Sequence, residues 1–283
     1  MSEIKLENVS YFHGKDTPYQ VKALDGIQIT VPGGMITGLI GHTGSGKSTL
    51  VQMFNGILKP DEGRVLLDGV DIWEKPKQIR GVRFEVGLVM QYPEYQLFEE
   101  TVYKDIAFGP KNMGLDEAEI HTRVLEAARF AGLDESLLDK SPFDLSGGQK
   151  RRAAIAGIIA MRPKVLVLDE PAAGLDPKGR EEIFSNIVQY QKESGSTVVI
   201  VSHSMEDMAR YCDNLIVMNG GRIWLQGDRD YVFSRSEQLT EIGLDIPQVT
   251  KLMLCLEAAG IDVDGGIYTV EQALERMLKI YGK

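Results

Sequence analysis

The stretch that decides the fold is Met35-Ile-Thr-Gly-Leu-Ile-Gly-His-Thr-Gly-Ser-Gly-Lys-Ser-Thr-Leu50. Residues 35–40 form a short apolar run typical of a buried strand, and residues 50–58 suit a helix. Between them, Gly41-x4-Gly46-Lys47-Ser48 has the pattern of a phosphate-binding loop, in which glycines let backbone N–H groups turn onto phosphate oxygens. Strand, glycine loop and helix follow in the order that this motif requires, so the sequence predicts a nucleotide site.

The loop supplies more than backbone amides. Lys47 can offset phosphate charge, Ser48 can ligate Mg²⁺, and the following helix directs its positive end at the same place. The alternative is a glycine-rich turn that merely precedes a helix, and the complete motif in its proper context argues against it. The residues expected to bind nucleotide here are Gly41, His42, Thr43, Gly44, Ser45, Gly46, Lys47, Ser48 and Thr49.

A second candidate segment ends in two acids. Residues 165–168 form an apolar strand that is followed by Asp169 and Glu170. Asp169 can hold Mg²⁺ through its hydration shell, and Glu170 is placed to orient and deprotonate an attacking water. Acidic pairs at strand ends are common, so this interpretation depends on the phosphate-binding loop upstream.

The wider periodicity predicts an α/β fold. Alternating apolar positions indicate half-buried strands in the first thirty residues. Residues 165–168 and 198–201 are apolar throughout, as expected of central strands of a parallel sheet covered on both faces. Residues 215–225 suggest a hairpin around Asn219-Gly220-Gly221. Helical periodicity runs from about 92 to 162, and one apolar face comprises Ile120, Val124, Ala127, Ala128 and Ala131.

Beyond residue 227 the pattern changes to short helices. Behind Pro247, apolar residues recur at i, i+3, i+4 and i+7, and Thr269 with Gln272 has the pattern of a capping box. The apolar positions are Val249, Leu252, Met253 and Leu256. We therefore expect one domain over 1–227, with a helical subdomain over about 92–162, and a helical appendage over 228–283.

Composition narrows the class of protein. Of 283 residues, 43% are hydrophobic and 25% charged, which is ordinary for a globular chain. The net charge of −10 argues against nucleic acid or anionic lipid as a partner bound through bulk charge. The sequence shows neither a run of the ~18 apolar residues that span a membrane nor a signal peptide. Cys212 and Cys255, both expected to be packed, indicate a reducing compartment. We expect a cytoplasmic protein that meets a membrane only through a partner.

A further motif, Leu145-Ser-Gly-Gly-Gln149, identifies a family. It opens a helical stretch, so its amides and the positive end of the helix can grip a phosphate. With the phosphate-binding loop and the segments named below, it resembles the ATP-binding subunits of ATP-binding-cassette (ABC) transporters over about residues 3–227. Those segments are Gln91, Asp169-Glu170-Pro171, Gly174-Leu175-Asp176 and His203.

The resemblance implies a fold and a dimer. Members have a P-loop NTPase fold with an N-terminal β subdomain, a RecA-like core and a helical subdomain. Two subunits pack head to tail, so that the signature loop of one closes on the γ-phosphate of the ATP held by Lys47 of the other. That loop comprises Ser146, Gly147, Gly148 and Gln149.

The resemblance also implies roles for single residues. Gln91 contacts Mg²⁺ and water, so that Ser48, Gln91 and Asp169 form the expected Mg²⁺ site. Asp176 makes a contact across the dimer. His203 contacts the γ-phosphate, and the alternative for it is an ordinary hydrogen-bonded histidine at a strand end.

The residue that stacks on adenine is left open between two candidates. Family members carry an aromatic residue close to His13, and Tyr11 stands two positions earlier.

Within the family, the chain is most similar to the ATPases of energy-coupling-factor (ECF) transporters, which import vitamins and transition metal ions. The resemblance implies two membrane partners, a transmembrane coupling subunit and a separate substrate-binding subunit, and a place at the cytoplasmic face of the membrane. It also implies that this chain is the second of two paralogous ATPases and pairs with the first. A homodimer stays open, because all the motifs occur in this one chain. The segments that carry the resemblance are 91–98, 108–112, 141–149, 169–177 and 244–249.

The charge next to Gln91 suggests a partner contact. Residues 91–105 hold four acids and one lysine, and in this family arginine-bearing helices of the transmembrane subunit insert there, so Glu94 is the expected contact. The alternative is a solvated acidic loop.

Two other functions compete with this interpretation: the ATPase of another ABC importer type, and an ABC ATPase that acts on nucleic acid or ribosomes. The chain has none of the coiled coils, second cassette or basic surface that the last class usually shows, so no nucleic acid partner is expected.

Overall fold

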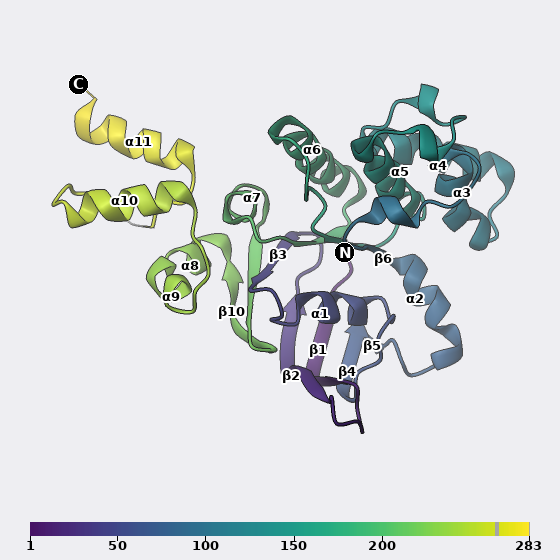
Figure 1. Cartoon of the computed structure of the whole chain (residues 1–283), viewed down its shortest axis with the longest axis horizontal. Coiled ribbons are helices and arrows are strands. Elements are labelled where there is room, and N and C mark those ends of the chain that lie inside the picture. The colour runs from purple at the N-terminus through teal and green to yellow at the C-terminus, as the bar shows by residue number, and fades with distance from the viewer. Residues whose placement is uncertain (264–265, 283) are drawn as a thin grey trace.

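Two sheets form the centre of the molecule, as seen in the computed structural model, which describes residues 1–263 and 266–282 (Figure 1). A four-stranded sheet has the order β2-β1-β4-β5, and a six-stranded sheet has the order β10-β9-β3-β8-β7-β6. The strands are β1 (Ile4–His13), β2 (Val21–Val31), β3 (Ile36–Gly41), β4 (Glu62–Leu67), β5 (Val70–Asp71), β6 (Val86–Val89), β7 (Val165–Asp169), β8 (Thr197–Val201), β9 (Asn214–Asn219) and β10 (Arg222–Asp228).

Helices cover both sheets and extend beyond them. The α-helices are α1 (Lys47–Phe54), α2 (Ile79–Glu85), α3 (Val102–Asn112), α4 (Glu117–Ala131), α5 (Gly147–Ile159), α6 (Pro177–Ser194), α7 (Met205–Tyr211), α8 (Arg229–Phe233), α9 (Ser236–Glu241), α10 (Gln248–Ala258) and α11 (Val270–Tyr281). Short 3-10 turns are η1 (Pro76–Gln78), η2 (Pro93–Gln96), η3 (Glu135–Leu137) and η4 (Pro142–Asp144). This α/β architecture is the predicted fold class.

The six-stranded sheet is parallel from β6 to β9, and β10 closes it antiparallel. Every residue of β3, β7 and β8 is buried, as the continuous apolar runs at these strands predict. Because the three strands are neighbours and point the same way, the residues that follow their carboxyl ends meet at one edge of the sheet.

The four-stranded sheet is antiparallel and contains an irregularity near Asn8. The register of β1 against β2 shifts between Leu6 and Val9, and Asn8 has a positive φ of 51°. The shift explains why Leu6 and Val9, three residues apart, are both fully buried. With α1, this sheet encloses a hydrophobic cluster against one face of the six-stranded sheet, where Phe54 of α1 packs.

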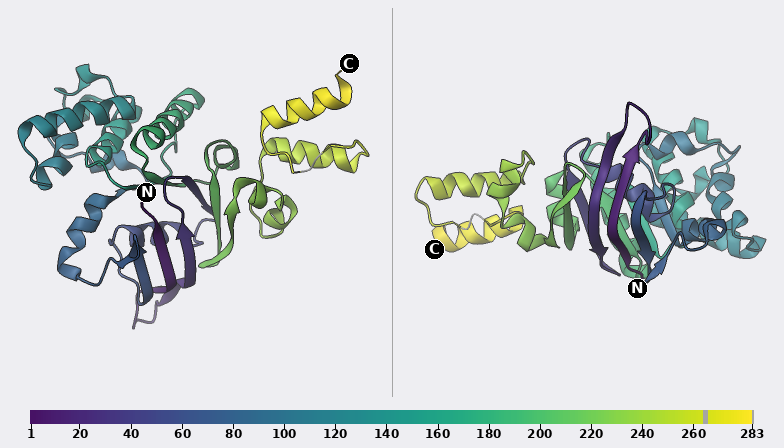
Figure 2. Two further views of the ribbon diagram at one scale, coloured as in Figure 1. Left: turned by 180° about the vertical axis from the view of Figure 1, so that it is seen from behind. Right: turned by 90° about the horizontal axis from the view of Figure 1, so that it is seen from below.

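Between β6 and β7 the chain makes a helical insertion that contains α3, α4 and α5 (Figure 2). The predicted face of α4 is buried at all five positions, and the helix ends at Gly132 in the left-handed conformation. This face packs in the larger hydrophobic cluster together with Phe184 and Ile187 of α6. The insertion therefore shares its core with the six-stranded sheet.

The residues after β10 form two parts. Helices α8 and α9 pack on the main core through Val232, Phe233 and Leu239. Helices α10 and α11 enclose a small separate cluster, and Figure 1 shows them projecting away from the sheets on the side opposite the insertion. The predicted capping box of Thr269 and Gln272 is present at the start of α11.

Two apolar side chains of this region are exposed, and one of them contradicts an expectation. The apolar spacing behind Pro247 does mark a helix, α10, in which Leu252 is 54% exposed because α10 has few neighbours besides α11. Cys255, expected to be packed, is also exposed, whereas Cys212 is buried and its pKa is raised by that burial. Both cysteines are free thiols.

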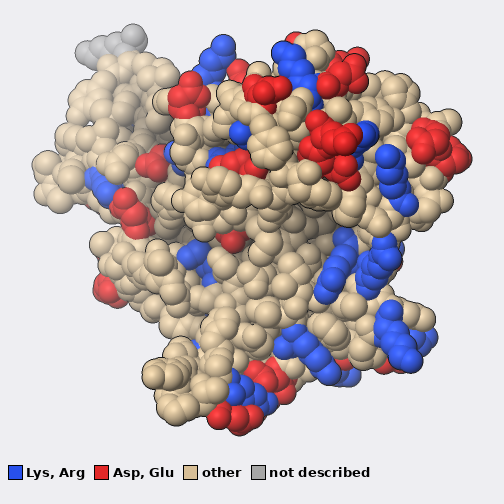
Figure 3. All heavy atoms as spheres, turned by 45° about the vertical axis from the view of Figure 1, so that its right-hand side comes forward, with Lys and Arg blue, Asp and Glu red and all other residues tan. Residues whose placement is uncertain are grey.

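The surface charge is unevenly distributed. Figure 3 shows Asp and Glu side chains gathered over the upper part of one face and Lys and Arg side chains over its lower right. Among the described residues, no helix combines the length and the apolarity that crossing a membrane requires.

The central strand β3 gives a test of this core. Leu39→Ala, at a fully buried position, should lower the free energy of unfolding by about 2–5 kcal/mol, because it removes packed methyl groups and leaves a cavity. Leu274→Ala, at a 60% exposed position of α11, is the matched control and should change it by less than about 0.5 kcal/mol. Urea unfolding measures both, and equal losses would contradict this description of the core.

Candidate functional site

A cavity of about 820 Å³ opens at the carboxyl edge of β3, β7 and β8. It collects predicted residues from five separate segments of the sequence, and this edge is the position where open α/β sheets bind ligands. The predicted residues on its wall are His13, Gly41, His42, Thr43, Gly44, Gly46, Lys47, Ser48, Thr49, Gln91, Asp169, Glu170 and His203.

The phosphate-binding loop has the backbone that its glycines predict. Gly41, Gly44 and Gly46 all have positive φ, and a Cβ at Gly46 would lie 2.7 Å from the carbonyl oxygen of Ala23. Lys47 begins α1 and donates through Nζ to the carbonyl oxygens of Gly41 (2.6 Å) and His42 (2.8 Å). The side chain thus lies along the loop, beside the amino end of α1.

The charge of Lys47 fits an anionic ligand. Burial lowers the pKa of its ammonium group, against the opposing effect of the carboxylates of Glu170 and Asp169. A phosphate placed in the loop would compensate this partly desolvated cation, and the amino end of α1 favours the same charge. The residues present therefore fit a nucleotide phosphate.

Ser48 and Asp169 meet across the cavity floor. Ser48 Oγ donates to Asp169 Oδ2 at 3.0 Å, although the two residues are 121 positions apart. Burial raises the pKa of Asp169, and the hydrogen bond from Ser48 acts in the opposite direction. Hydroxyl and carboxylate oxygens are the ligands that Mg²⁺ accepts beside phosphate oxygens and water. Within the described residues no group of three or more His, Cys, Asp or Glu side chains could hold a metal.

Glu170 and His203 form a pair at the mouth of the cavity. Glu170 has a positive φ of 52°, and its N–H donates to the carbonyl oxygen of Val201 at 2.9 Å. Its Oε1 lies 2.9 Å from Nδ1 of His203, whose side chain is 79% exposed. A non-glycine residue in the left-handed region is held there by its surroundings, and such strain is concentrated at functional positions. The pair can orient a water molecule and accept its proton.

Gln91 reaches the cavity, but Glu94, three residues later, does not present a free carboxylate. Arg151 of α5, which is 4% exposed, donates Nε and Nη2 to both oxygens of Glu94 at 3.1 and 2.9 Å. Arg151 also donates Nη1 to the carbonyl oxygen of Ala173. Within the chain, the carboxylate of Glu94 is thus already paired, and its contact with an arginine of a partner stays a prediction.

The acidic stretch around Glu94 is also partly internal. Asp105 is buried and accepts from the backbone N–H groups of Phe98 and Glu99, and burial raises its pKa. Glu100 is exposed and pairs with Lys104. Charge counted along the sequence thus overstates the acidity that this segment offers to a partner.

The signature loop lies on the helical insertion, away from the cavity wall of its own chain. Ser146 caps α5 and forms a capping box with Gln149, so the helix begins with Gly147 and Gly148 at an exposed amino end. Asp176 caps α6 by accepting from the N–H of Gly179 at 2.9 Å. Ser45, the remaining loop residue, is buried, and its hydroxyl has no hydrogen-bond partner in the described structure.

The two candidates for adenine stacking differ in position. His13 is on the cavity wall, and its Nε2 lies 3.3 Å from Thr49 Oγ1. Tyr11 packs against the hydrophobic cluster of the first sheet and meets the His13 ring edge to face. This geometry favours His13 as the residue that faces a bound base.

The sequence analysis missed one wall of the cavity, which comes from the appendage. Gly243, Leu244 and Asp245 line it, and the His42 ring nitrogen Nε2 lies 2.8 Å from the carbonyl oxygen of Ile242. The same wall region includes Val21, Lys22, Ala23, Val201, Met205 and Gly221. No motif marks these residues, and His42 and Ile242 are 200 positions apart, so pattern reasoning had no signal for the contact.

The Glu94–Arg151 pair can be tested by stability. Glu94→Gln should lower the free energy of unfolding by about 3 kcal/mol, because it leaves the buried Arg151 charge uncompensated. The matched control Glu100→Gln breaks an exposed pair and should cost less than about 1 kcal/mol. Urea unfolding measures the free energy of unfolding of both variants. An equal loss in the two would mean that the buried pair contributes no more to stability than a surface pair.

The contact between loop and appendage can be tested by nucleotide affinity. Gly243→Ala adds a Cβ 3.3 Å from His42 Nε2, so the ring must shift, and the Kd for ATP should rise about three- to tenfold, the effect of one lost hydrogen bond. Gly260→Ala is the matched control: its φ is as positive, and its Cβ would meet nothing within 4 Å. Calorimetric titration with ATP would refute the link if both variants bound equally well.

Comparison with known proteins agrees with the site. A family model described as ABC transporter matches residues 24–173. An energy-coupling factor transporter ATP-binding protein EcfA2 of Caldanaerobacter subterraneus subsp. tengcongensis is 52% identical over 276 residues, covering 98% of this chain and 96% of the relative. The protein of the same name from Clostridium tetani is 51% identical over 279 residues, covering 98% and 97%.

Solved structures show the same relationship. The structure of cbiO1 from Clostridium perfringens, described as part of the ABC transporter complex cbiONQ, has a TM-score of 0.75 at 45% identity and covers 89% of this chain and 98% of its own. The ATP-binding cassette MJ0796, dimeric and bound to ADP and Pi, has a TM-score of 0.72 at 28% identity, covering 80% and 98%. The chain therefore belongs to the ATP-binding subunits of ABC transporters and, among them, to the energy-coupling-factor group.

Proposed function

We propose that this protein hydrolyses ATP to drive an energy-coupling-factor importer for vitamins or transition metal ions. The observation that carries the proposal is the Glu170–His203 pair, held at 2.9 Å beside the phosphate-binding loop and the Ser48–Asp169 contact. These groups supply a phosphate cradle, a candidate base and a candidate γ-phosphate contact in one cavity.

The residues divide the work of hydrolysis between them. The loop amides and Lys47 bind the β- and γ-phosphates and offset the negative charge that develops during transfer. Glu170 takes a proton from the water that attacks the γ-phosphorus, so the bond from phosphorus to the bridging oxygen breaks and ADP and phosphate leave. His203, hydrogen-bonded to Glu170, holds that carboxylate and faces the γ-phosphate. His13 is the proposed contact of adenine.

Mg²⁺ is the metal that these residues fit. Ser48 and Asp169 would hold it directly or through water, and Gln91 stands on the same wall. When bound, Mg²⁺ would offset the negative charge of the phosphates.

The site is proposed to be completed by a second ATPase subunit. In one chain, Ser146 and the amino end of α5 lie on the insertion, whereas Lys47 lies in the cavity, so a single chain has two separate phosphate-binding ends. Head-to-tail pairing would place the signature loop and Asp176 of one subunit on the ATP of the other. We propose that the second subunit is a paralogous ATPase. A complex that contains two copies of this chain would contradict that pairing.

The transmembrane coupling subunit is proposed to dock beside Gln91, at the cytoplasmic face of the membrane, with a separate membrane subunit capturing the substrate. The surface there carries exposed aromatic side chains: Tyr95 is 85% exposed and Phe143 is 74% exposed. Between them lies a small hollow of about 180 Å³. Glu94 stays the proposed contact for an arginine of that subunit, and we propose that these aromatic side chains, the type that dominates binding energy at interfaces, belong to the same docking surface.

Glu170→Gln tests the chemistry. Turnover of the assembled complex should fall by roughly 10²–10⁴, the range for loss of a general base, while ATP binding is retained. Steady-state phosphate release and ATP titration measure the two quantities, and near-normal turnover would remove Glu170 from its role. The mass of the ATP-bound Glu170→Gln complex also reports which two ATPase chains have paired.

Tyr95→Ala combined with Phe143→Ala tests the docking surface. Co-purification with the transmembrane subunit should fall at least about tenfold, because two aromatic anchors are lost. The matched control is Tyr19→Ala, which removes an 86% exposed aromatic side chain from the segment between β1 and β2. Undiminished recovery of the complex with the double variant would place the membrane partner elsewhere.

A further inference from the structure

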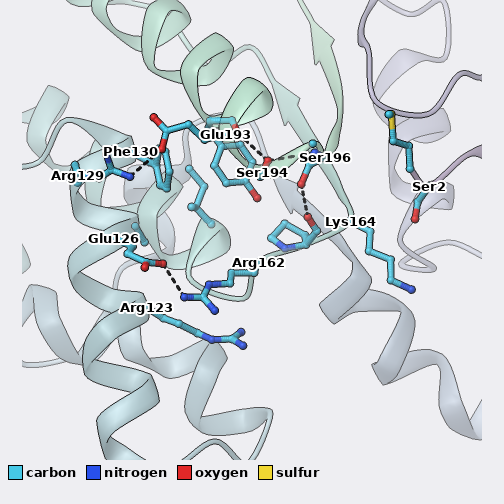
Figure 4. A pocket seen from close by; sticks show the side chains of 16 residues that line it. Ser2, Arg123, Glu126, Arg129, Phe130, Arg162, Lys164, Glu193, Ser194 and Ser196 are labelled. Atoms are coloured by element: carbon cyan, nitrogen blue, oxygen red, sulfur yellow. Dashed lines mark hydrogen bonds and ion pairs between the residues drawn. The ribbon is translucent and has the colours of Figure 1, made fainter.

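A second cavity, of about 750 Å³, lies at the amino edge of the six-stranded sheet, opposite the ATP site (Figure 4). Lys164 and Ser196, which line it, come directly before β7 and β8, and α4 and α6 supply half of its lining residues. Its volume is within the range of small-molecule pockets in proteins. None of the residues described above for ATP or partner binding takes part in it.

The floor of the cavity carries a buried hydroxyl group that lacks a partner. Tyr190 is 3% exposed, and its hydroxyl makes no hydrogen bond of normal geometry among the described residues, although the hydroxyls of Ser196 and Ser194 lie near enough to lower its pKa. The neighbouring hydroxyls donate elsewhere: Ser194 Oγ to the carbonyl oxygen of Tyr190 (2.7 Å) and Ser196 Oγ to that of Pro163 (2.9 Å). Burial raises the pKa of Tyr190, so the group keeps its proton and can donate. Buried polar groups normally have a hydrogen-bond partner, so a ligand in the cavity would supply the acceptor that this hydroxyl lacks.

The walls next to the floor are apolar and aromatic. Phe130 of α4 meets the Tyr190 ring edge to face, with centroids 5.4 Å apart, and Ile159 and Pro163 line the same space. Such a surface suits a flat ring, because aromatic side chains add a specific contact geometry to the area that they bury.

The opening is bordered by four cationic side chains. Arg123, Arg129, Arg162 and Lys164 line the cavity against Glu126 and Glu193. Each of these cations is paired with a carboxylate: Lys164 with Glu85, Arg129 with Glu193, Arg123 with Glu119, and Arg162 with Glu119 and Glu126. An anion would therefore be bound through guanidinium donors that these pairs leave unused, and not through an excess of positive charge. Figure 4 shows the guanidinium groups of Arg123 and Arg162 close together below Glu126.

These two arginines keep donors for a ligand. Arg123 uses Nε on Glu119 (2.7 Å) and Nη1 on the carbonyl oxygen of Met161, and Arg162 uses its two Nη atoms on Glu119 and Glu126. Within the described chain, Nη2 of Arg123 and Nε of Arg162 have no hydrogen bond and can serve a carboxylate or phosphate. Glu119 lies outside the cavity wall and fixes both guanidinium groups in place.

We propose that this cavity binds a small aromatic anion that carries a second polar group on its ring. The anionic end lies against Arg123 and Arg162, the ring lies between Phe130 and Ile159, and the second polar group accepts from the Tyr190 hydroxyl. Because α4 belongs to the helical insertion and α6 to the sheet core, the ligand touches both and is placed to act as an effector of their relative position.

The experiment compares two probes on the full chain saturated with ADP and Mg²⁺: 4-hydroxybenzoate, and benzoate, which lacks the hydroxyl. Titrations followed by NMR should show saturable binding of both. Tyr190→Phe should weaken 4-hydroxybenzoate about two- to tenfold, the effect of one neutral hydrogen bond, and leave benzoate within twofold. Arg162→Gln should weaken both at least about tenfold, since it removes a charged donor. Arg64→Gln, an exposed arginine paired with Glu7, should change neither.

Thermal unfolding separates this role from a structural one. Tyr190→Phe should leave Tm unchanged or raise it, because it deletes a buried hydroxyl that has no partner in the protein. A clear fall in Tm would mean that the hydroxyl is already satisfied and would overturn the proposal. Absence of saturable binding, or binding that is indifferent to both Tyr190→Phe and Arg162→Gln, would also overturn it and leave a cavity that holds water only.

Discussion

The parallel pairing of β3, β8 and β7 is the constraint on which the ATP site depends. Each strand is buried along its whole length, so its register is set by the core and not by the site. The chain then leaves the three strands at one edge and delivers the phosphate-binding loop, the Asp169–Glu170 pair and His203 to the same place. The contact of Ser48 with Asp169 is a direct result of that pairing.

Arg151 links the parts of the site that the sheet does not position. Its guanidinium group holds Glu94 next to Gln91, and through Ala173 it also holds the segment that follows Glu170. Arg151 itself lies one turn after Ser146, at the start of α5. A buried cation with partners on two segments permits little independent movement, so the signature helix, the Gln91 segment and the Glu170 segment are mechanically joined within one subunit.

Features that depend on consecutive residues could be predicted from the sequence. The phosphate-binding loop, the central strands and the capping box at Thr269 depend on local patterns and could be predicted. Pairings over long sequence distances could not: Glu94 meets Arg151 57 residues away, and His42 meets Ile242. The apolar pattern behind Pro247 predicted helix α10 but could not indicate that Leu252 is exposed, since a periodic stripe marks an apolar face and not whether anything covers it.

The wall that Gly243, Leu244 and Asp245 contribute to the ATP cavity has a consequence for how such chains can be recombined. A cassette cut after β10 would keep every recognisable motif and still lose one side of its nucleotide site. Exchanging this carboxyl-terminal region between relatives would therefore transplant part of the nucleotide pocket as well, so the region and the cassette must change together during evolution and in protein engineering.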